Sequence, residues 1–246
     1  MNTIMTHKKV KLFVLILFCI SLTGLNAQTV KDIDENVYHT VTIGKQVWMV
    51  ENLKTTKYNN GDPISKVADI DVWKALETGG YCDYNNDVNN SLACGRLYNW
   101  YAVDDKRNIA PKGWHVPSID EWQILVDYLG GYNVAALKLK KSTGWPDVQG
   151  KQRNGTNESG FSALPGQLRR DNGNTYVFSN SNDGILYGSC FWSSTCFPRE
   201  ATDDDENNLD DIAKGFNMYF KNGIDLISIG GEFDKTQGRA VRCIKD

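Results

Sequence analysis

The chain has 246 residues, with 27 Lys and Arg against 30 Asp and Glu and a formal net charge of −3. Without its first 27 residues, which hold three basic and no acidic side chains, the balance becomes 24 against 30, or −6. Nucleic acid is not an expected partner, because its binding depends on clustered Lys and Arg and the one dense charge run here is acidic.

The first 27 residues have the pattern of a secretory signal peptide. Three lysines precede an uncharged run at 12–22, and Leu25-Asn26-Ala27 follows as a cleavage site. The run is 11 residues long, whereas a membrane-spanning helix needs about 20. Cys19 follows bulky residues, so lipidation is not expected. We therefore expect residues 1–27 to be removed and the protein to be secreted, periplasmic or at the cell surface, without integral membrane insertion.

The segment after the leader alternates with a period of two residues. Along residues 37–43, every second residue belongs to one set of side chains and the residues between them to another. Gly44-Lys45 interrupts this alternation before residues 46–50. This pattern predicts a β-hairpin. Residues 58–95 are rich in Asn, Asp and Gly, so we expect loops, a short helix at 72–76, and room for a ligand.

The clearest predicted helix begins at Ser118. Glu121 follows three residues later, so each side chain can accept from the other's backbone N–H in a capping box. Apolar residues then recur at helical spacing until Gly130-Gly131. These glycines predict that the helix ends there with a residue in the left-handed conformation. A second short helix is expected at 133–140.

The rest of the chain has the patterns of strands. Short apolar or alternating runs predict strands near residues 161–164, 175–178, 185–195, 216–220, 224–229 and 240–244. The chain contains neither a repeat of fixed period nor a Pro-rich hinge. We therefore expect residues 28–246 to form a single α+β domain, in which the capped helix packs on antiparallel sheets and a β-hairpin comes first.

Five cysteines lie beyond the leader, so at least one has no partner within the monomer. Cys82 and Cys94 bracket a loop that closes easily, which makes them the first choice for a disulfide, worth about 3 kcal/mol. Cys190 and Cys196 lie in a predicted strand, where extended chain would separate them by about 20 Å against roughly 5.5 Å for bonded Cα atoms. The pairing of Cys190, Cys196 and Cys243 stays open.

A loop with alternating oxygen-bearing side chains is the candidate metal site. Asp83, Asn85 and Asp87 have the spacing of calcium-loop ligands. Val88 and Cys94 stand where an EF-hand has Gly and Glu. Calcium is therefore one interpretation and solvated turn structure the other, since Asx residues favour turns by themselves. No other cofactor is indicated.

Aromatic side chains are abundant, and most should lie in the core. Trp73, Tyr84 and Trp145 are the candidates for stacking on a sugar or a protein partner. Two histidines remain beyond the leader, His39 and His115, and no nucleophile spacing accompanies them. The chain is therefore not expected to be an enzyme. The six carboxylates at 203–211 favour an exposed loop over a cation site.

Seven stretches in one order resemble a known family. They are VTIGKQVWMVENL (41–53), GYCDYNND (80–87), GRLYNWYAV (95–103), PKGWHVPS (111–118) with Glu121-Trp122, GFSALPG (160–166), FWSST (191–195) and VRCIKD (241–246). Together they look like the Fibrobacter succinogenes major paralogous domain, an exported family of Bacteroidota and Fibrobacter without an established activity. The resemblance implies a C-type-lectin-like fold in which the first and last strands pair.

Two positions depart from the family's pattern. Family members commonly carry a cysteine where this chain has Ala110, and that cysteine would pair with the one in the VRC stretch, so Cys243 is expected to have lost its partner. Lectins that bind sugar through calcium use Trp-Asn-Asp, and the nearest analogue here is Trp192-Ser193-Ser194. Sugar binding of that kind is therefore not supported.

The function expected from these features is that of an exported, non-catalytic binding or adhesion module. Its ligand would be a glycan or another envelope protein, presented to loop-borne polar and aromatic residues. The alternative is a structural surface protein that assembles with copies of itself, and an enzyme comes third.

Overall fold

A computed structural model describes residues 28–147, 150, 152–170, 175–177, 186–197, 212–221 and 224–246. The predicted signal peptide at 1–27 and the acidic run at 203–211 lie outside these residues. Within them, no helix is both long and apolar enough to cross a membrane.

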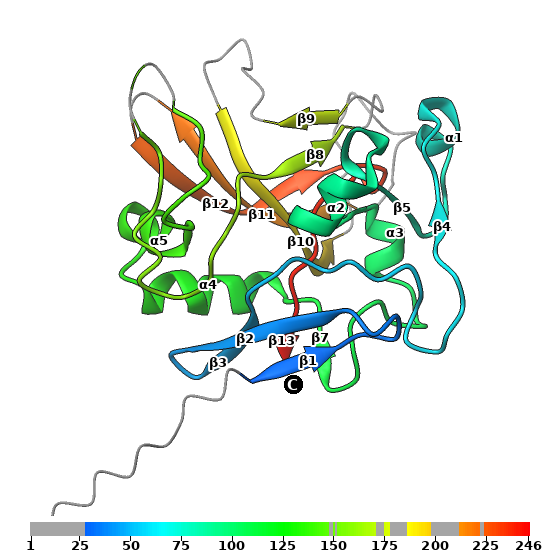
Figure 1. Cartoon of the computed structure of the whole chain (residues 1–246), viewed down its shortest axis with the longest axis horizontal. Helices are drawn as coiled ribbons and strands as arrows, with labels where there is room; N and C mark the ends of the chain where they lie inside the picture. Colours follow the sequence, from blue (N-terminus) through cyan, green and yellow to red (C-terminus); the bar gives the residue numbers. More distant parts are fainter. Residues whose placement is uncertain are drawn as a thin grey trace, which may run out of the picture.

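A five-stranded sheet contains both ends of the described chain (Figure 1). Its strands, in order across the sheet, are β1 (Thr29–Lys31), β2 (Val37–Ile43), β3 (Gln46–Met49), β13 (Ile244–Lys245) and β7 (Trp114–His115). The predicted hairpin is confirmed: β2 pairs antiparallel with β3, and Gly44 takes the left-handed φ of 61° that the tight turn requires. The last strand pairs with β3, so the two ends of the chain stabilise one sheet.

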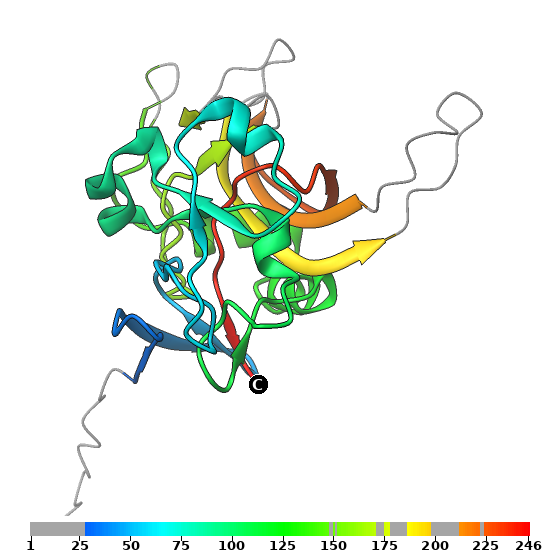
Figure 2. The same cartoon turned by 90° about the vertical axis from the view of Figure 1, so that its right-hand side faces the viewer.

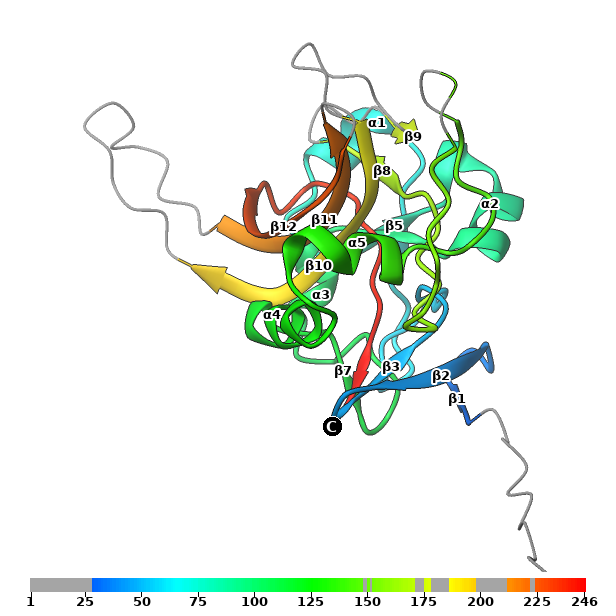
Figure 3. The same ribbon diagram turned by 90° about the vertical axis from the view of Figure 1, so that its left-hand side faces the viewer.

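A second, antiparallel sheet is long and curled, as Figure 2 shows. It consists of β10 (Leu186–Phe197), β11 (Ile212–Lys221) and β12 (Ile224–Phe233). Two helices, α4 (Ile119–Tyr128) and α5 (Tyr132–Leu139), pack against it (Figure 3). Both helices and these strands agree with the prediction to within a few residues. The capping box also forms, because Ser118 accepts from the Glu121 N–H and Glu121 accepts from the Ser118 N–H.

The Asn- and Asp-rich region is more ordered than the sequence suggests. Its elements are β4 (Ser65–Lys66), α1 (Ile70–Lys74), β5 (Gly80–Cys82), the 3-10 turn η1 (Tyr84–Asn86) and α2 (Val88–Cys94). It continues into β6 (Leu97–Tyr98) and α3 (Trp100–Val103). The helix expected at 72–76 corresponds to α1, whereas α2 was not predicted. Later in the chain β8 (Gln167–Arg169) pairs with β9 (Thr175–Val177).

The C-terminal segment 238–243 joins these parts. Its backbone bonds in turn to Arg169, Tyr98, Cys190, Leu53 and Met49, which belong to different elements. Because its partners change along its length, the strand predicted at 240–244 is reduced to isolated bridges followed by the short β13. The strand predicted at 161–164 is also wrong: Ala163 makes one isolated bridge to Lys140.

Alternate residues of this segment enter different hydrophobic clusters. Val241 and Cys243 pack with Tyr98 and Trp192, while Ala240 and Ile244 pack with the aromatic residues under α4. This alternation is expected of extended backbone, whose side chains point to opposite sides in turn. The architecture is therefore α+β, with mixed helices and mostly antiparallel sheets.

Candidate functional site

A cleft of about 220 Å³ lies between the segment after β3 and the end of α2. Its lining residues come from four separate segments of the chain: 50–52 with Lys54, 92–95, Lys141, and Ser162 with Leu164. Both polar and apolar atoms face the space. A concave surface that collects polar groups from several segments is the usual form of a small-ligand site.

Asn52 is the buried amide on which the cleft is built. Its Nδ2 donates to the carbonyl of Cys94 at 2.8 Å, which ties the β3 side of the cleft to the α2 side. Gly95 follows with φ 88°, and a Cβ there would lie 2.5 Å from the Asn52 Cβ. The two walls therefore approach as closely as they do because residue 95 is glycine.

Arg242 lies directly behind Asn52 and is fully buried. Its Nε and Nη2 donate to Asn52 Oδ1 at 3.0 and 2.6 Å, and its Nη1 donates to the carbonyl of Phe161. The guanidinium carbon also lies 4.2 Å from the centre of the Phe161 ring. Burial lowers the pKa of Arg242 to about 9, and the charge of Glu51 opposes that shift. Arg242 therefore remains a cation at neutral pH.

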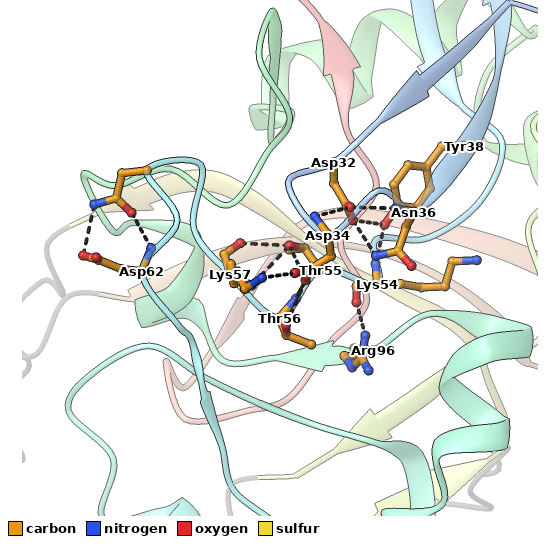
Figure 4. Close-up of polar contacts among 11 residues, drawn as sticks. Asp32, Asp34, Asn36, Tyr38, Lys54, Thr55, Thr56, Lys57, Asp62 and Arg96 are labelled. Carbon is orange, nitrogen blue, oxygen red and sulfur yellow. Dashed lines mark hydrogen bonds and ion pairs between the residues drawn. The ribbon is translucent and has the colours of Figure 1, made fainter.

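Lys54 is held in place by its own backbone. Its N–H donates to the Tyr38 hydroxyl at 2.8 Å, and its carbonyl accepts from Arg96. Tyr38 in turn donates to Asp32 at 2.6 Å. Figure 4 shows the Lys54 side chain extending away from this polar network, which includes Asp34. The network thus positions the lysine without neutralising its ammonium group.

Ser162 and Cys94 complete the lining. Ser162 has a φ of 57°, a left-handed conformation that is unusual for a residue other than glycine, and Asn157 bonds to both its N–H and its hydroxyl. Strained backbone conformations of this kind persist only where the surrounding structure holds them, and they cluster at functional sites. Cys94 is a half-buried thiol, and burial raises its pKa while the charge of Lys141 works in the opposite direction.

The three aromatic residues predicted to stack on a ligand are all buried, so that prediction is corrected. Trp73 is enclosed under α1, where its Nε1 donates to the carbonyl of Thr236. Tyr84 packs in the same cluster as Trp73. Trp145 donates to the carbonyl of Ala163 at 3.0 Å. Each supplies the large apolar surface that this β-rich fold needs in its interior.

The three oxygen-bearing residues of the candidate calcium loop are used separately. Asp83 is fully buried and forms ion pairs with Lys66 at 2.5 Å and Arg96 at 3.5 Å. Asn85 and Asp87 are exposed, and Asp87 caps α2 by accepting from a backbone N–H. The described residues include no group of three or more His, Cys, Asp or Glu arranged to hold a metal ion. These contacts agree with the turn interpretation of the loop.

The predicted bridge between Cys82 and Cys94 is not present in the structure, where both residues are thiols. Cys82 points into the cluster around Trp73, whereas Cys94 lines the cleft on the far end of α2. Cys243 is buried in the same hydrophobic cluster as Ala110, the position where the family pattern has a cysteine. The loss of a partner for Cys243 by substitution at residue 110 stays a prediction.

Neither histidine is among the lining residues of the cleft, and each is held by carboxylates. His39 Nδ1 lies 2.8 Å from Glu51 Oε1, and the His39 N–H donates to Glu51 Oε2. His115 bridges two acids, with Nδ1 2.7 Å from Asp246 and Nε2 2.8 Å from Glu121. Both ring nitrogens of His115 are therefore occupied, as expected for a structural residue.

The cleft was not predicted from the sequence, although the stretches that carry the family resemblance were a signal for it. Three of the seven stretches that carry the family resemblance contribute lining residues, namely 41–53, 95–103 and 160–166, and Arg242 of a fourth lies behind Asn52. Their convergence on one surface cannot be seen from spacing along the chain, because up to 190 positions separate residues that touch.

The sequence profile of the Fibrobacter succinogenes major domain matches residues 41–245. A search of curated proteins found no match, and neither did a search of solved structures. The matched stretch runs from within β2 to the end of β13 and includes every segment of the cleft. This protein therefore belongs to the Fibrobacter succinogenes major domain family.

Proposed function

We propose that this protein is an exported, non-catalytic binding or adhesion module that holds a small ligand, or the end of a larger one, in the cleft beside α2. The observation that carries the proposal is that three family stretches, 41–53, 95–103 and 160–166, line that cleft, with Arg242 of a fourth bonded to Asn52 behind it. The proposed partner is a glycan or an envelope protein. Loops that surround a rigid scaffold are the usual place for such recognition.

The chemistry of the cleft favours binding over catalysis. Its one thiol, Cys94, has a pKa raised by burial, and no histidine is among its lining residues. A nucleophile needs an adjacent base or a lowered pKa to act. His115, the more buried of the two histidines, has both ring nitrogens bonded to carboxylates.

The wider setting of the module is also proposed. Residues 1–27 act as a signal peptide, and residues 28–246 form one domain of C-type-lectin-like architecture. The pairing of the C-terminal strand with the N-terminal hairpin supports this architecture. The protein is secreted, periplasmic or at the cell surface, and its recovery from the cytoplasm of the native organism would count against the whole proposal.

The test is a glycan array together with a pull-down from envelope extract, using the purified protein and two variants. Ala93→Trp fills the cleft from an exposed lining position, whereas Ala75→Trp adds the same side chain to an exposed position at the end of α1. We expect the parent and Ala75→Trp to retain a partner and Ala93→Trp to bind it at least about tenfold more weakly, equivalent to about 1.4 kcal/mol. Empty results from both assays contradict the proposal.

Self-assembly is the second candidate, and one surface favours it. Large apolar side chains are exposed on α4 and α5, namely Ile124, Tyr128, Tyr132 and Leu137. Contiguous exposed apolar surface often marks a protein contact. Sedimentation that depends on concentration, and that Tyr128→Lys abolishes, would favour this candidate over ligand binding.

A further inference from the structure

We infer that the cleft recognises an anionic group, the carboxylate or sulfate ester of an acidic saccharide. This inference rests on the proposed binding function and adds a ligand chemistry to it. It is carried by the arrangement of charged side chains around the cleft.

Two lysines from different parts of the chain line the same small space. Lys54 follows β3 and Lys141 follows α5. Neither ammonium group has a carboxylate within ion-pair distance among the residues that the structure describes. The Lys54 ammonium lies 5.7 Å from the centre of the Tyr38 ring, a contact that leaves its charge in place. An anion that enters a cleft lined by two lysines is attracted to both.

The one acidic residue of the lining is already engaged. Both oxygens of Glu51 are bonded to His39, one to the ring and one to the backbone N–H, each at 2.8 Å. Neither oxygen of Glu51 is therefore bonded to a lysine of the cleft, although its charge still acts at a distance, as it does on Arg242. The lining carries two cations and one anion.

A third cation lies behind the wall. Arg242 is fully buried, and three hydrogen bonds from its guanidinium go to the neutral oxygens of Asn52 and Phe161. A charge in a poorly solvated interior is screened less than one at the surface, so its field reaches the cleft. The chain beyond residue 27 has a net charge of −6, so this cationic cleft differs in sign from the protein around it.

The size of the cleft limits the ligand. Its volume of about 220 Å³ lies below the range of about 300 to 1,000 Å³ typical of sites for drug-sized ligands. One sugar ring fits such a space better than a longer saccharide does. Val50, Leu92 and Leu164 supply apolar lining for the carbon–hydrogen face of a ring.

The half-buried thiol of Cys94 provides a reporter inside the cleft. Iodoacetamide alkylates accessible thiols, and peptide mass spectrometry measures the rate at each cysteine. Cys196 is also half-buried but lies on β10, outside the cleft, so it is an internal control. The probes are a glucuronic acid oligosaccharide, a sulfated oligosaccharide and a neutral glucose oligosaccharide of equal length.

We expect at least one acidic saccharide to slow alkylation of Cys94 and not of Cys196, and the neutral saccharide to have no effect. The response to each acidic probe identifies the preferred anion. Raising the salt concentration should weaken the protection, because exposed charges are screened. Replacing both lysines with glutamine should weaken binding at least roughly 100-fold, since two hydrogen bonds from charged groups are replaced by weaker neutral ones.

The matched control is Lys45→Gln with Lys112→Gln, which removes two exposed lysines outside the cleft and should leave the protection unchanged. Because Lys141 influences the pKa of Cys94, protection is scored within each variant as the ratio of rates with and without saccharide. Equal protection by the neutral saccharide, or full protection in Lys54→Gln with Lys141→Gln, overturns the anion inference and leaves the binding function standing. Absence of protection by every saccharide, while the array still shows binding, overturns the assignment to this cleft. Absence of both defeats the proposed function itself.

Discussion

The aromatic core under α4 and the cleft beside α2 share one neighbour, Arg242, and are held together in opposite ways. In the core, Trp122 stacks on Phe216 with ring centres 4.2 Å apart and planes at 10°. At the cleft, Asn52 is held by hydrogen bonds to Arg242 and to the carbonyl of Cys94. Arg242 has its flat face on Phe161 and its N–H groups on Asn52, so it forms the boundary.

This difference predicts different responses to mutation. A core of packed rings depends on filled volume, so its stability falls with each atom removed. A buried polar pair depends on mutual satisfaction, so the loss of one partner is costly while the loss of both is much less so.

The largest expected effect is in the core. Trp122→Ala removes the ring that contacts Phe216 and Trp48, and should lower the free energy of unfolding by about 3 to 5 kcal/mol, measured by urea denaturation. Trp122→Phe keeps most of the volume and should lose under about 2 kcal/mol. A loss below about 1 kcal/mol for the alanine variant would show that ring packing is not what stabilises this half.

The next effect tests the polar side of the comparison. Arg242→Met leaves the oxygens of Asn52 and Phe161 without these donors and should lower the free energy of unfolding by about 2 to 3 kcal/mol. Adding Asn52→Leu removes the unsatisfied amide, so the double variant should be more stable than the sum of the single variants predicts by about 1 to 2 kcal/mol. Strict additivity in urea denaturation would contradict the proposed coupling.

The smallest effect concerns the C-terminal residue and pH. Burial by itself lowers the pKa of His115, but hydrogen bonds and charge from Asp246 and Glu121 outweigh it, so the pKa is raised above 6.5. Protonated His115 therefore stabilises the fold, fully below about pH 6.5, and this contribution is lost as pH rises through the raised value. The side chain is 39% exposed, so we expect less than about 1 kcal/mol.

The measurement is the free energy of unfolding from pH 5.5 to 8.5 for the parent and for His115→Gln. The parent should lose more stability than the variant over this range. His39→Gln is the matched control, because His39 lies on β2 of the same sheet and is bonded to a different carboxylate, that of Glu51. Equal pH profiles for the parent and His115→Gln would show that the bridge to Asp246 contributes nothing.

Local patterns predicted the elements whose partners are close in sequence. The hairpin, the capping box at Ser118 and Glu121, and the strands of the curled sheet all follow from alternation, capping and turn residues. Composition misled the prediction for 58–95, because Asn and Asp there cap helices and turns as well as forming loops.

There is a physical reason why the candidate site could not be predicted from the sequence. Trp73, Tyr84 and Trp145 were chosen because aromatic rings bind sugars, but the same rings are also the best core residues, and burial is decided by packing. The spacing around Asp83 allows both a calcium site and a turn, because Lys66 and Arg96 approach Asp83 only once the chain is folded. The identity of a residue does not reveal which charged side chains will lie next to it in the folded protein.

By itself, the sequence determined the family, the α+β composition of the elements and the odd number of cysteines, which leaves at least one without a partner in the monomer, because each depends on residue order or count. The tertiary structure alone decided that segment 238–243 would run between the sheets and carry Arg242 behind Asn52, 190 positions away. It also decided which lysines remain without an acid and which tryptophans are enclosed. Contacts between distant segments arise from the packing of the whole chain, and no local pattern encodes them.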